Sequence, residues 1–262
     1  MTQTLNVISF NVRYSKGDDG ENSWKNRRAM LFYYLREQQP DLIGAQEILR
    51  PQLKQITEAL PGYQWIGVGR ENGKRKGEYA AIFYRADRLK PLDSGTFWLS
   101  EKPEKPGSMS WNTACTRICT LAQFLDLATS QTFWHYNTHF DHVSGKAREN
   151  SARLIIERMK QQAGDAPIIL TGDLNTGEDD VCVRILKDAG LRDTFRVIHP
   201  YVEGVRTFHD FNGGHEGEKI DYIFVSPQWK VQTAAIDFFN QEDRYPSDHY
   251  PVTTKIQQNP KQ

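Results

Sequence analysis

Ile168-Ile169-Leu170-Thr171-Gly172-Asp173-Leu174-Asn175 is an apolar run that passes directly into a glycine, a carboxylate and an amide. The run predicts a β-strand, and Gly172 permits close approach of another backbone or of a ligand. In extended backbone Asp173 and Asn175 point the same way, so one carboxylate would lie beside one amide. Such a pair can deprotonate and orient a water molecule. The alternative is an Asx-turn that only closes the strand.

Similar strand patterns recur along the chain. Runs rich in β-forming residues and bounded by turn residues predict strands at Leu5–Val12, Asp41–Ala45, Tyr79–Tyr84, Thr113–Leu127, Thr132–Thr138, Pro167–Thr171, Lys219–Val225 and Val231–Phe239. Helical periodicity predicts two long helices, Trp24–Gln39 with a stripe at Trp24, Arg28, Leu31 and Leu35, and Lys146–Gln162 with a stripe at Arg148, Ala152, Ile155 and Met159. Pro40 and Gly164 end these helices. Pro51–Leu60 and Glu178–Ala189 are expected to be shorter helices.

The two halves of the chain share one order of elements. In each half a strand, a loop, a helix and a second strand follow one another, and both strands end in polar residues: Ser9-Phe10-Asn11 and Gln46-Glu47, then Asn137-Thr138-His139 and Gly172-Asp173-Leu174-Asn175. Two such units packed sheet against sheet give an α+β fold, a four-layer α–β–β–α sandwich with the helices outside. The polar strand ends would then meet at one rim. No linker or low-complexity stretch divides residues 1–262, which predicts a single domain.

The composition is that of an ordinary globular protein, with 33 Lys plus Arg against 33 Asp plus Glu in 262 residues. A formal net charge of zero gives no support for a strong nucleic-acid binder, although a local basic patch is possible. The basic clusters Lys74-Arg75-Lys76 and Arg27-Arg28 are expected to be solvated surface. No signal-peptide pattern or long apolar run predicts export or membrane insertion. Cys115, Cys119 and Cys182 lack disulfide or zinc spacing, so reduced thiols and a cytoplasmic location are expected.

Further candidate residues stand at strand ends. Glu47 follows Leu42-Ile43-Gly44-Ala45, and a carboxylate at the mouth of a buried strand needs a cation or hydrogen-bond donors. Asp221 begins an apolar strand, and Asp248-His249 precedes the last one, so a hydrogen bond between an aspartate and His249 would fix the imidazole tautomer. The alternative for each is structural: a capping or surface glutamate, and a turn with a satisfied histidine.

An arginine and two histidines are further candidates. Arg117, expected within a strand between Cys115 and Cys119, needs an anion, either a protein carboxylate or a phosphate. His139 and His142 lack the spacing of the helical zinc motif, so metal binding by His142 is not expected.

Six motifs together resemble the endonuclease/exonuclease/phosphatase superfamily, which includes deoxyribonuclease I-like nucleases, abasic-site endonucleases, deadenylases, neutral sphingomyelinases and inositol-polyphosphate phosphatases. The motifs are Ser9-Phe10-Asn11, Gln46-Glu47, Thr138-His139, Gly172-Asp173-Leu174-Asn175, Ile220-Asp221-Tyr222 and Ser247-Asp248-His249. They occur in the family order and cover nearly the whole chain. The stretches 77–84 and 97–100 look most like an uncharacterised bacterial branch.

The resemblance implies a role for each matching residue. Glu47, with Asn11 nearby and Asp248 completing the site, would hold Mg²⁺ or Mn²⁺. Asp173 would activate the attacking water and Asn175 would orient it. His249, paired with Asp221, would hydrogen-bond the phosphoryl oxygens. By resemblance to nuclease members, Glu78 would pair with His139 near the leaving group, and Arg117 would contact a phosphate.

These roles predict a divalent-metal-dependent phosphoesterase, expected to act as a monomer on a small or single-stranded phosphodiester. The alternatives are a nuclease on duplex DNA and a binding protein that kept the fold without catalysis. The sequence carries no Gly-x-Ser-x-Gly elbow and no Walker loop. Three loops are expected to select the substrate, Lys16–Ser23, Ser100–Asn112 and Tyr201–Glu218. Their aromatic residues, Trp24, Trp98, Trp111, Phe208, His209 and Phe211, would either stack on the substrate or pack the loops down.

Overall fold

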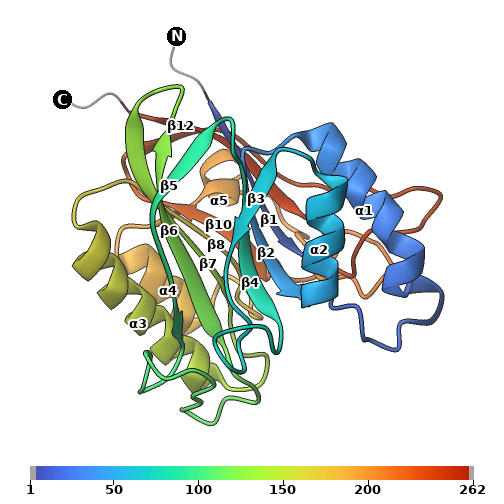
Figure 1. Ribbon diagram of the computed structural model, residues 1–262, viewed down its shortest axis with the longest axis horizontal. Helices are drawn as coiled ribbons and strands as arrows, with labels where there is room; N and C mark the ends of the chain where they lie inside the picture. Colours follow the sequence, from blue (N-terminus) through green and yellow to red (C-terminus); the bar gives the residue numbers. More distant parts are fainter. Residues whose placement is uncertain (1–3, 260–262) are drawn as a thin grey trace.

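The computed structural model describes residues 4–259 and shows two mixed β-sheets packed face to face, with helices on both outer sides (Figure 1). This confirms the α–β–β–α sandwich. The first sheet has the strand order β11 (Trp229–Ile236), β12 (Val252–Gln258), β1 (Leu5–Asn11), β2 (Leu42–Ile48), β4 (Tyr79–Arg85) and β3 (Tyr63–Ile66). The second has the order β5 (Leu89–Trp98), β6 (Ile118–Asp126), β7 (Gln131–His139), β8 (Ile168–Asp173), β10 (Asp221–Val225) and β9 (Arg192–Asp193).

The repeated strand–helix–strand unit is confirmed in both halves. β1 and β2 are parallel and are joined through α1 (Trp24–Gln38), and β7 and β8 are parallel and are joined through α3 (Gly145–Ala163). A parallel pair needs a crossover connection, and a helix supplies it. The remaining helices are the short 3₁₀ turn η1 (Gly20–Asn22), α2 (Arg50–Ala59), α4 (Val181–Asp188) and α5 (Thr194–Ile198).

Three apolar clusters hold the layers together. The cluster between the sheets includes Val7, Leu42 and Ile82 from the first sheet and Phe124, Ile169 and Ile223 from the second. A second cluster joins α3 and α4 to the outer face of β6, β7, β8 and β10, and a third joins α1 and α2 to β1, β2 and β4. No helix in the described part of the chain is long and apolar enough to cross a membrane.

The strand registers bring the polar strand ends to one rim of the sandwich. Asn11 lies opposite Gln46 in the first sheet, while Asp173 lies between His139 and Asp221 in the second. Below this rim the sheets approach closely at Gly44, where an added Cβ would lie 1.8 Å from the Thr171 hydroxyl oxygen. A side chain at position 44 would therefore force the two halves of the rim apart.

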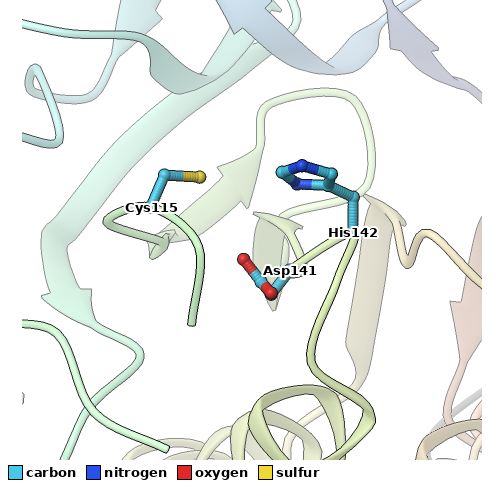
Figure 2. Close-up of side chains that lie close together, drawn as sticks. All are labelled: Cys115, Asp141 and His142. Atoms are coloured by element: carbon cyan, nitrogen blue, oxygen red, sulfur yellow. The ribbon is translucent and has the colours of Figure 1, made fainter. Parts of the chain in front are cut away.

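The predicted strands omit β3, β5 and β9, and two further differences bear on the site. β6 begins at Ile118 rather than Thr113, because the Asp141 carboxylate accepts hydrogen bonds from the Thr113 hydroxyl and the Ala114 amide and holds this segment in a loop. Cys115 therefore lies on a loop near Asp141 and His142 (Figure 2), and Arg117 precedes the strand instead of lying within it. The three cysteines are free thiols, as expected.

The inner face of α1 also differs from the predicted stripe. The buried residues of this helix are Trp24, Arg27, Leu31, Tyr34 and Leu35. Arg27 is therefore buried, contrary to the expected surface cluster, and it takes the place in the stripe that was predicted for Arg28. Lys74, Arg75 and Lys76 are exposed, as expected.

Candidate active site

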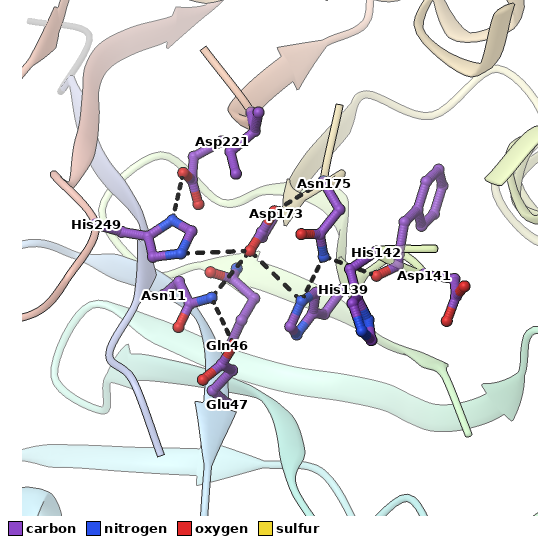
Figure 3. A network of polar contacts seen from close by, with 12 residues as sticks. Asn11, Gln46, Glu47, His139, Asp141, His142, Asp173, Asn175, Asp221 and His249 are labelled. Atoms are coloured by element: carbon purple, nitrogen blue, oxygen red, sulfur yellow. Dashed lines mark hydrogen bonds and ion pairs between the residues drawn. The ribbon is translucent and has the colours of Figure 1, made fainter. Parts of the chain in front are cut away.

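Asp173 lies at the centre of the rim and is almost completely buried, at 1% exposure. Its Oδ1 accepts a hydrogen bond from the Asn175 backbone N–H at 2.8 Å, and its Oδ2 accepts one from Asn11 Nδ2 at 2.9 Å (Figure 3). Burial and the neighbouring Asp221 carboxylate raise the pKa of Asp173 to about 7. A carboxylate with this pKa is matched to proton abstraction near neutral pH.

The turn after Asp173 combines both interpretations of the motif. The bond from the Asn175 amide to Asp173 is that of an Asx-turn, and Asn175 has a left-handed backbone with φ of 52°. This turn aims the Asn175 side chain at His139, where Nδ2 lies 2.8 Å from Nε2. The turn thus closes the strand and at the same time presents the amide to the rim.

Asp221 and His249 form the hydrogen-bonded pair expected from the sequence. Asp221 Oδ2 lies 2.8 Å from His249 Nδ1, and His249 Nε2 lies 3.9 Å from Asp173 Oδ2. Although burial favours a neutral ring, the Asp221, Asp173 and Asp248 carboxylates together raise the pKa of His249 to about 10. At neutral pH the ring is therefore an imidazolium that donates from Nδ1 to Asp221 and presents Nε2–H to the rim.

We expect Asp221→Asn to lower the pKa of His249 from about 10 toward or below its ordinary 6.5, because the main charge that opposes the burial penalty is removed. The stabilising contribution of this pair is present below the unfolded-state pKa and disappears as the pH rises through the folded-state pKa, so the variant should lose stability mainly at neutral pH and below. An NMR titration of the His249 ring nitrogens measures the shift. An unchanged titration in Asp221→Asn would show that the pair does not set the charge of this ring.

Glu47, Asn11 and Asp248 lie on the other side of Asp173 and come from the first sheet and the loop before β12. Glu47 has a left-handed backbone, φ 61°, at an irregularity of β2 between Ala45 and Ile48. Its Oε1 lies 3.2 Å from Asn11 Nδ2, and its Oε2 accepts from the Tyr14 backbone N–H at 3.2 Å. Burial raises the pKa of Asp248, and the Glu47 carboxylate contributes in the same direction.

This group of residues suits a hard divalent cation. Glu47 and Asp248 supply carboxylate oxygens, the ligands that Mg²⁺ prefers. The pKa of Asp248 is raised chiefly by burial, and a cation beside it would favour the ionised form. The amide of Asn11, in contrast, turns its Nδ2 toward Glu47 and Asp173, while its Oδ1 accepts from the Arg13 N–H. In this orientation Asn11 is a hydrogen-bond donor between two carboxylates rather than an oxygen ligand.

A second arrangement of possible metal ligands overlaps the catalytic pair. One ligand atom each from Asp173, Asp221 and His249 lies within 4.8 Å of the others. An imidazolium cannot coordinate a metal, and His249 Nδ1 is already bonded to Asp221. The geometry of these three residues therefore fits proton transfer and hydrogen bonding better than metal binding.

His139 and Glu78 both face the site, but they are not paired with each other in the described structure. Glu78 forms an ion pair with Arg70, at 2.7 Å between Oε2 and Nη1, whereas His139 lies beside Asn175 and 3.4 Å from Asp173 Oδ2. Arg70 is the stronger partner because its guanidinium fits a carboxylate with two bonds. Burial and the nearby Arg117 hold the pKa of His139 well below its ordinary value, so this ring is neutral.

Arg117 is 5% exposed and lines the same cavity as His139 and Asp173. Its Nη2 lies 3.1 Å from His142 Nδ1, while Nε and Nη1 are buried and have no hydrogen-bond partner among residues 4–259. Asp141 is 3.9 Å away, but its two oxygens already accept bonds from Thr113, Ala114, Val143 and Ser144. Arg117 thus has donors available for an anion.

The same contacts argue against a metal at the cluster of Cys115, Asp141 and His142, whose ligand atoms also lie within 4.8 Å of one another (Figure 2). Both oxygens of Asp141 already accept hydrogen bonds, and the guanidinium of Arg117 places a positive charge beside the cluster. A cation would have to displace both. The expectation that His142 is not a metal ligand agrees with these contacts.

All the predicted site residues except Asn11 and Asp221 line a cavity of about 420 Å³, here called the rim pocket. It is lined by Arg13, Tyr14, Glu47, Arg70, Glu78, Cys115, Arg117, His139, His142, Asp173, Asn175, Phe208, Ile220, Asp248 and His249. Arg13 and Arg70 were not predicted to belong to the site. In the sequence, Arg13 is marked only by its position two residues after Asn11, and Arg70 only by its place in a polar loop.

The aromatic loop residues divide between the two predicted roles. Trp24, Trp98 and His209 are buried and pack their loops down. Phe208 is 42% exposed, lines the rim pocket, and has its ring centre 5.0 Å from that of His249. Of the aromatic residues singled out from the sequence, Phe208 is therefore the one that lines the rim pocket, beside Tyr14.

A two-sheet sandwich with a buried aspartate, an aspartate–histidine pair and carboxylates at one rim defines the deoxyribonuclease I-like class of folds. The model of the endonuclease/exonuclease/phosphatase family matches residues 8–249, and the chain belongs to this family. Members of the family hydrolyse phosphoesters.

Solved structures and curated proteins agree with this membership. A family member from Bacteroides vulgatus is 38% identical, with a TM-score of 0.92 over 98% of this chain and 100% of that one. A mannosyl-6-phosphatase from Bacteroides thetaiotaomicron is 36% identical, with a TM-score of 0.88 over 96% and 99%. Nocturnin from Drosophila melanogaster is 23% identical over 88% of this chain. The matches span only 41% of nocturnin and at most 60% of the other curated relatives.

Proposed function

We propose that the protein is a divalent-metal-dependent phosphoesterase that hydrolyses a small phosphoester bound in the rim pocket. The observation that carries this proposal is that Asp173, His249 and Arg117 line one cavity, with Asp221 bonded to the His249 ring from behind it. A binding protein that had lost catalysis is disfavoured because the proposed base, its amide neighbour and the imidazolium are all present. We take residues 1–262 as one domain that acts as a monomer.

The proposed chemistry assigns one task to each side of the pocket. Asp173, ionised above its pKa of about 7, accepts a proton from the attacking water. His249 donates from Nε2 to a phosphoryl oxygen, and Asp221 keeps its ring charged and oriented. Mg²⁺ or Mn²⁺ bound by Glu47 and Asp248 would neutralise charge on the phosphoryl group. Arg117 binds a further oxygen with its unpaired Nε and Nη1.

A sugar phosphomonoester is the first substrate class to test. The mannosyl-6-phosphatase aligns over nearly the whole of both chains, and a terminal phosphoryl group carries the two negative charges that His249, Arg117 and a cation would balance. The second class is a small or single-stranded phosphodiester, whose leaving group would extend over the exposed ring of Phe208. His139, being neutral, adds no positive charge for either class.

The direct test is a comparison of kcat/KM for hexose 6-phosphates, bis-p-nitrophenyl phosphate and a single-stranded oligonucleotide, each with Mg²⁺, with Mn²⁺ and with chelator. We expect turnover of a small phosphoester that disappears with chelator. Turnover that is unaffected by chelator would contradict the metal dependence. Absence of turnover on a broad panel, with Mg²⁺ bound, would favour a binding protein.

Duplex DNA is not the expected substrate. Binding of a duplex rests on neutralising many phosphates and weakens steeply with salt. The net charge is zero, and within the exposed cluster at residues 74–76 Lys76 is paired with Glu71. Efficient plasmid nicking with a steep negative salt dependence of kcat/KM would overturn this expectation.

A further inference from the structure

Arg27 is a buried arginine without a carboxylate partner among its hydrogen bonds. Its side chain lies on the inner face of α1, and the residue is 2% exposed. The guanidinium lies between the rings of Trp24 and Phe211, at 5.0 and 5.8 Å from their centres. Burial lowers the pKa of Arg27 to about 10, so the group stays charged at neutral pH. A buried charge of this kind is retained only where its hydrogen bonds compensate for lost water.

The bonds of Arg27 all go to backbone carbonyl oxygens, and these belong to three separate segments. Nε donates to Asn22 at 3.0 Å, and Nη1 donates to Val12 at 2.6 Å and to Pro246 at 2.8 Å. Nη2 donates to Arg13 at 2.7 Å. Val12 and Arg13 follow Asn11, and Pro246 precedes Ser247-Asp248-His249. One side chain therefore joins the loop after β1 to the loop that carries Asp248 and His249.

Gln52 on α2 makes a matching connection from the other helix. This residue is completely buried, its Nε2 donates to the Arg13 carbonyl at 2.9 Å, and its Oε1 accepts from the Ser15 and Leu49 N–H groups at 2.9 and 3.1 Å. Leu49 lies two residues after Glu47. The Arg13 carbonyl thus accepts from both Arg27 and Gln52, where the first turns of α1 and α2 converge.

Two residues in or beside the segments that these side chains connect have an unfavourable backbone conformation. Arg13 has φ of 55° and Glu47 has φ of 61°, both in the left-handed region that non-glycine residues rarely adopt. Such conformations persist only where the surrounding structure determines them, and they gather at functional sites. One of these residues is Glu47, a proposed metal ligand, and the other is Arg13, whose Nε lies 3.6 Å from Asp248 Oδ2.

We propose that Arg27 and Gln52 are positioning residues that fix the metal-binding side of the rim pocket by clamping the loops that follow Asn11 and Glu47 and the loop that carries Asp248. The inference rests on the proposed metal dependence. Neither side chain lines the pocket, so each acts through the backbone. Loss of the clamp would let the loops relax, and the carboxylates would lose the spacing that a small cation demands.

The test is calorimetric titration of the full-length protein with MgCl₂, combined with thermal unfolding and with kcat measured over a range of Mg²⁺ concentrations. Arg27→Lys keeps the charge but cannot reach four carbonyls, so we expect the Kd for Mg²⁺ to rise at least about tenfold, as is typical when a residue that only orients a metal site is changed. The kcat should recover at saturating Mg²⁺. Arg36→Lys is the matched control, because Arg36 on the same helix also donates to a carbonyl, that of Ala59 at 2.9 Å, away from the pocket.

The outcomes separate the clamp from the metal site itself. If the wild type binds Mg²⁺ and Arg27→Lys binds it within twofold of the wild-type Kd, the positioning role is overturned, even where the melting temperature falls. If the wild type binds no Mg²⁺, the proposed metal dependence fails and the inference fails with it. Where Arg27→Lys does not fold, Gln52→Met decides by the same criterion, since it removes the second connection to Arg13 without changing the charge.

Discussion

Asp173→Asn is expected to keep the fold and to lower kcat by at least about 10²–10⁴-fold, the usual contribution of a positioned general base. The substitution is nearly isosteric, and it removes a carboxylate whose pKa in the folded protein is about 7. Activity of the wild type should fall as the pH drops below 7, because the Asp173 carboxylate becomes protonated there. The measurements are kcat between pH 5 and 9 for both proteins on a substrate that the wild type turns over.

The stability of this variant has a predictable dependence on pH. A folded-state pKa raised from 3.8 to about 7 means that the ionised carboxylate destabilises the folded protein increasingly between those pH values and constantly above them. Asparagine carries no such penalty, so the melting temperature of Asp173→Asn relative to the wild type should rise from pH 4 to pH 8 in chelator. Asp188→Asn, at the exposed end of α4, is the control and should show no such trend. Near-normal turnover by Asp173→Asn would mean that another group is the base.

The strand ends could be predicted because their signals are local. An apolar run followed by Gly172 and Asp173 predicts a buried strand with a carboxylate at its mouth, and β8 is such a strand. The parallel pairs β1–β2 and β7–β8 follow from the repeated strand–helix–strand order, since a helical crossover places both polar ends at one edge. The pairing of Asp221 with His249 is found for the same reason, as both stand at strand ends that meet at the rim.

The contacts of long side chains could not be predicted in this way. Glu78 pairs with Arg70 instead of His139 because the loop at 69–77 folds back, with its ends held by bonds such as Arg70 N–H to the Glu78 carbonyl. Arg27 is buried although Asn26 and Arg28 beside it are polar, because at this position the inner face of α1 meets backbone carbonyl groups, which accept its hydrogen bonds. Composition cannot distinguish that buried face from a solvated one. Arg117 lies before β6 because Thr113 and Ala114 are held by Asp141. This partner is distant in sequence, so the local pattern could not reveal that the strand begins later.

Glu47→Gln is the variant from which we expect the largest loss of metal binding. The change keeps the shape of the side chain and its left-handed backbone, but it removes a full negative charge from the proposed ligand set. The Kd for Mg²⁺ should rise by more than the 10–100-fold typical of residues that only orient a metal site. Activity should fall in parallel and should recover in part at high Mg²⁺, because the base Asp173 and the His249–Asp221 pair remain.

Calorimetric titration of Glu47→Gln with MgCl₂ measures this effect, with Glu58→Gln on α2 as the control. Glu58 has 62% side-chain exposure and is within reach only of Lys54, so its loss should leave the Kd unchanged. Unchanged Mg²⁺ affinity in Glu47→Gln would indicate that the cation binds instead at the alternative group formed by Asp173, Asp221 and His249. Asp221→Asn would then become the variant that loses the cation, whereas in the arrangement proposed here it alters the charge of His249 and leaves the metal in place. The pair of titrations therefore distinguishes a cation held by Glu47 and Asp248, with a separate acid–base centre, from a cation that occupies that centre itself.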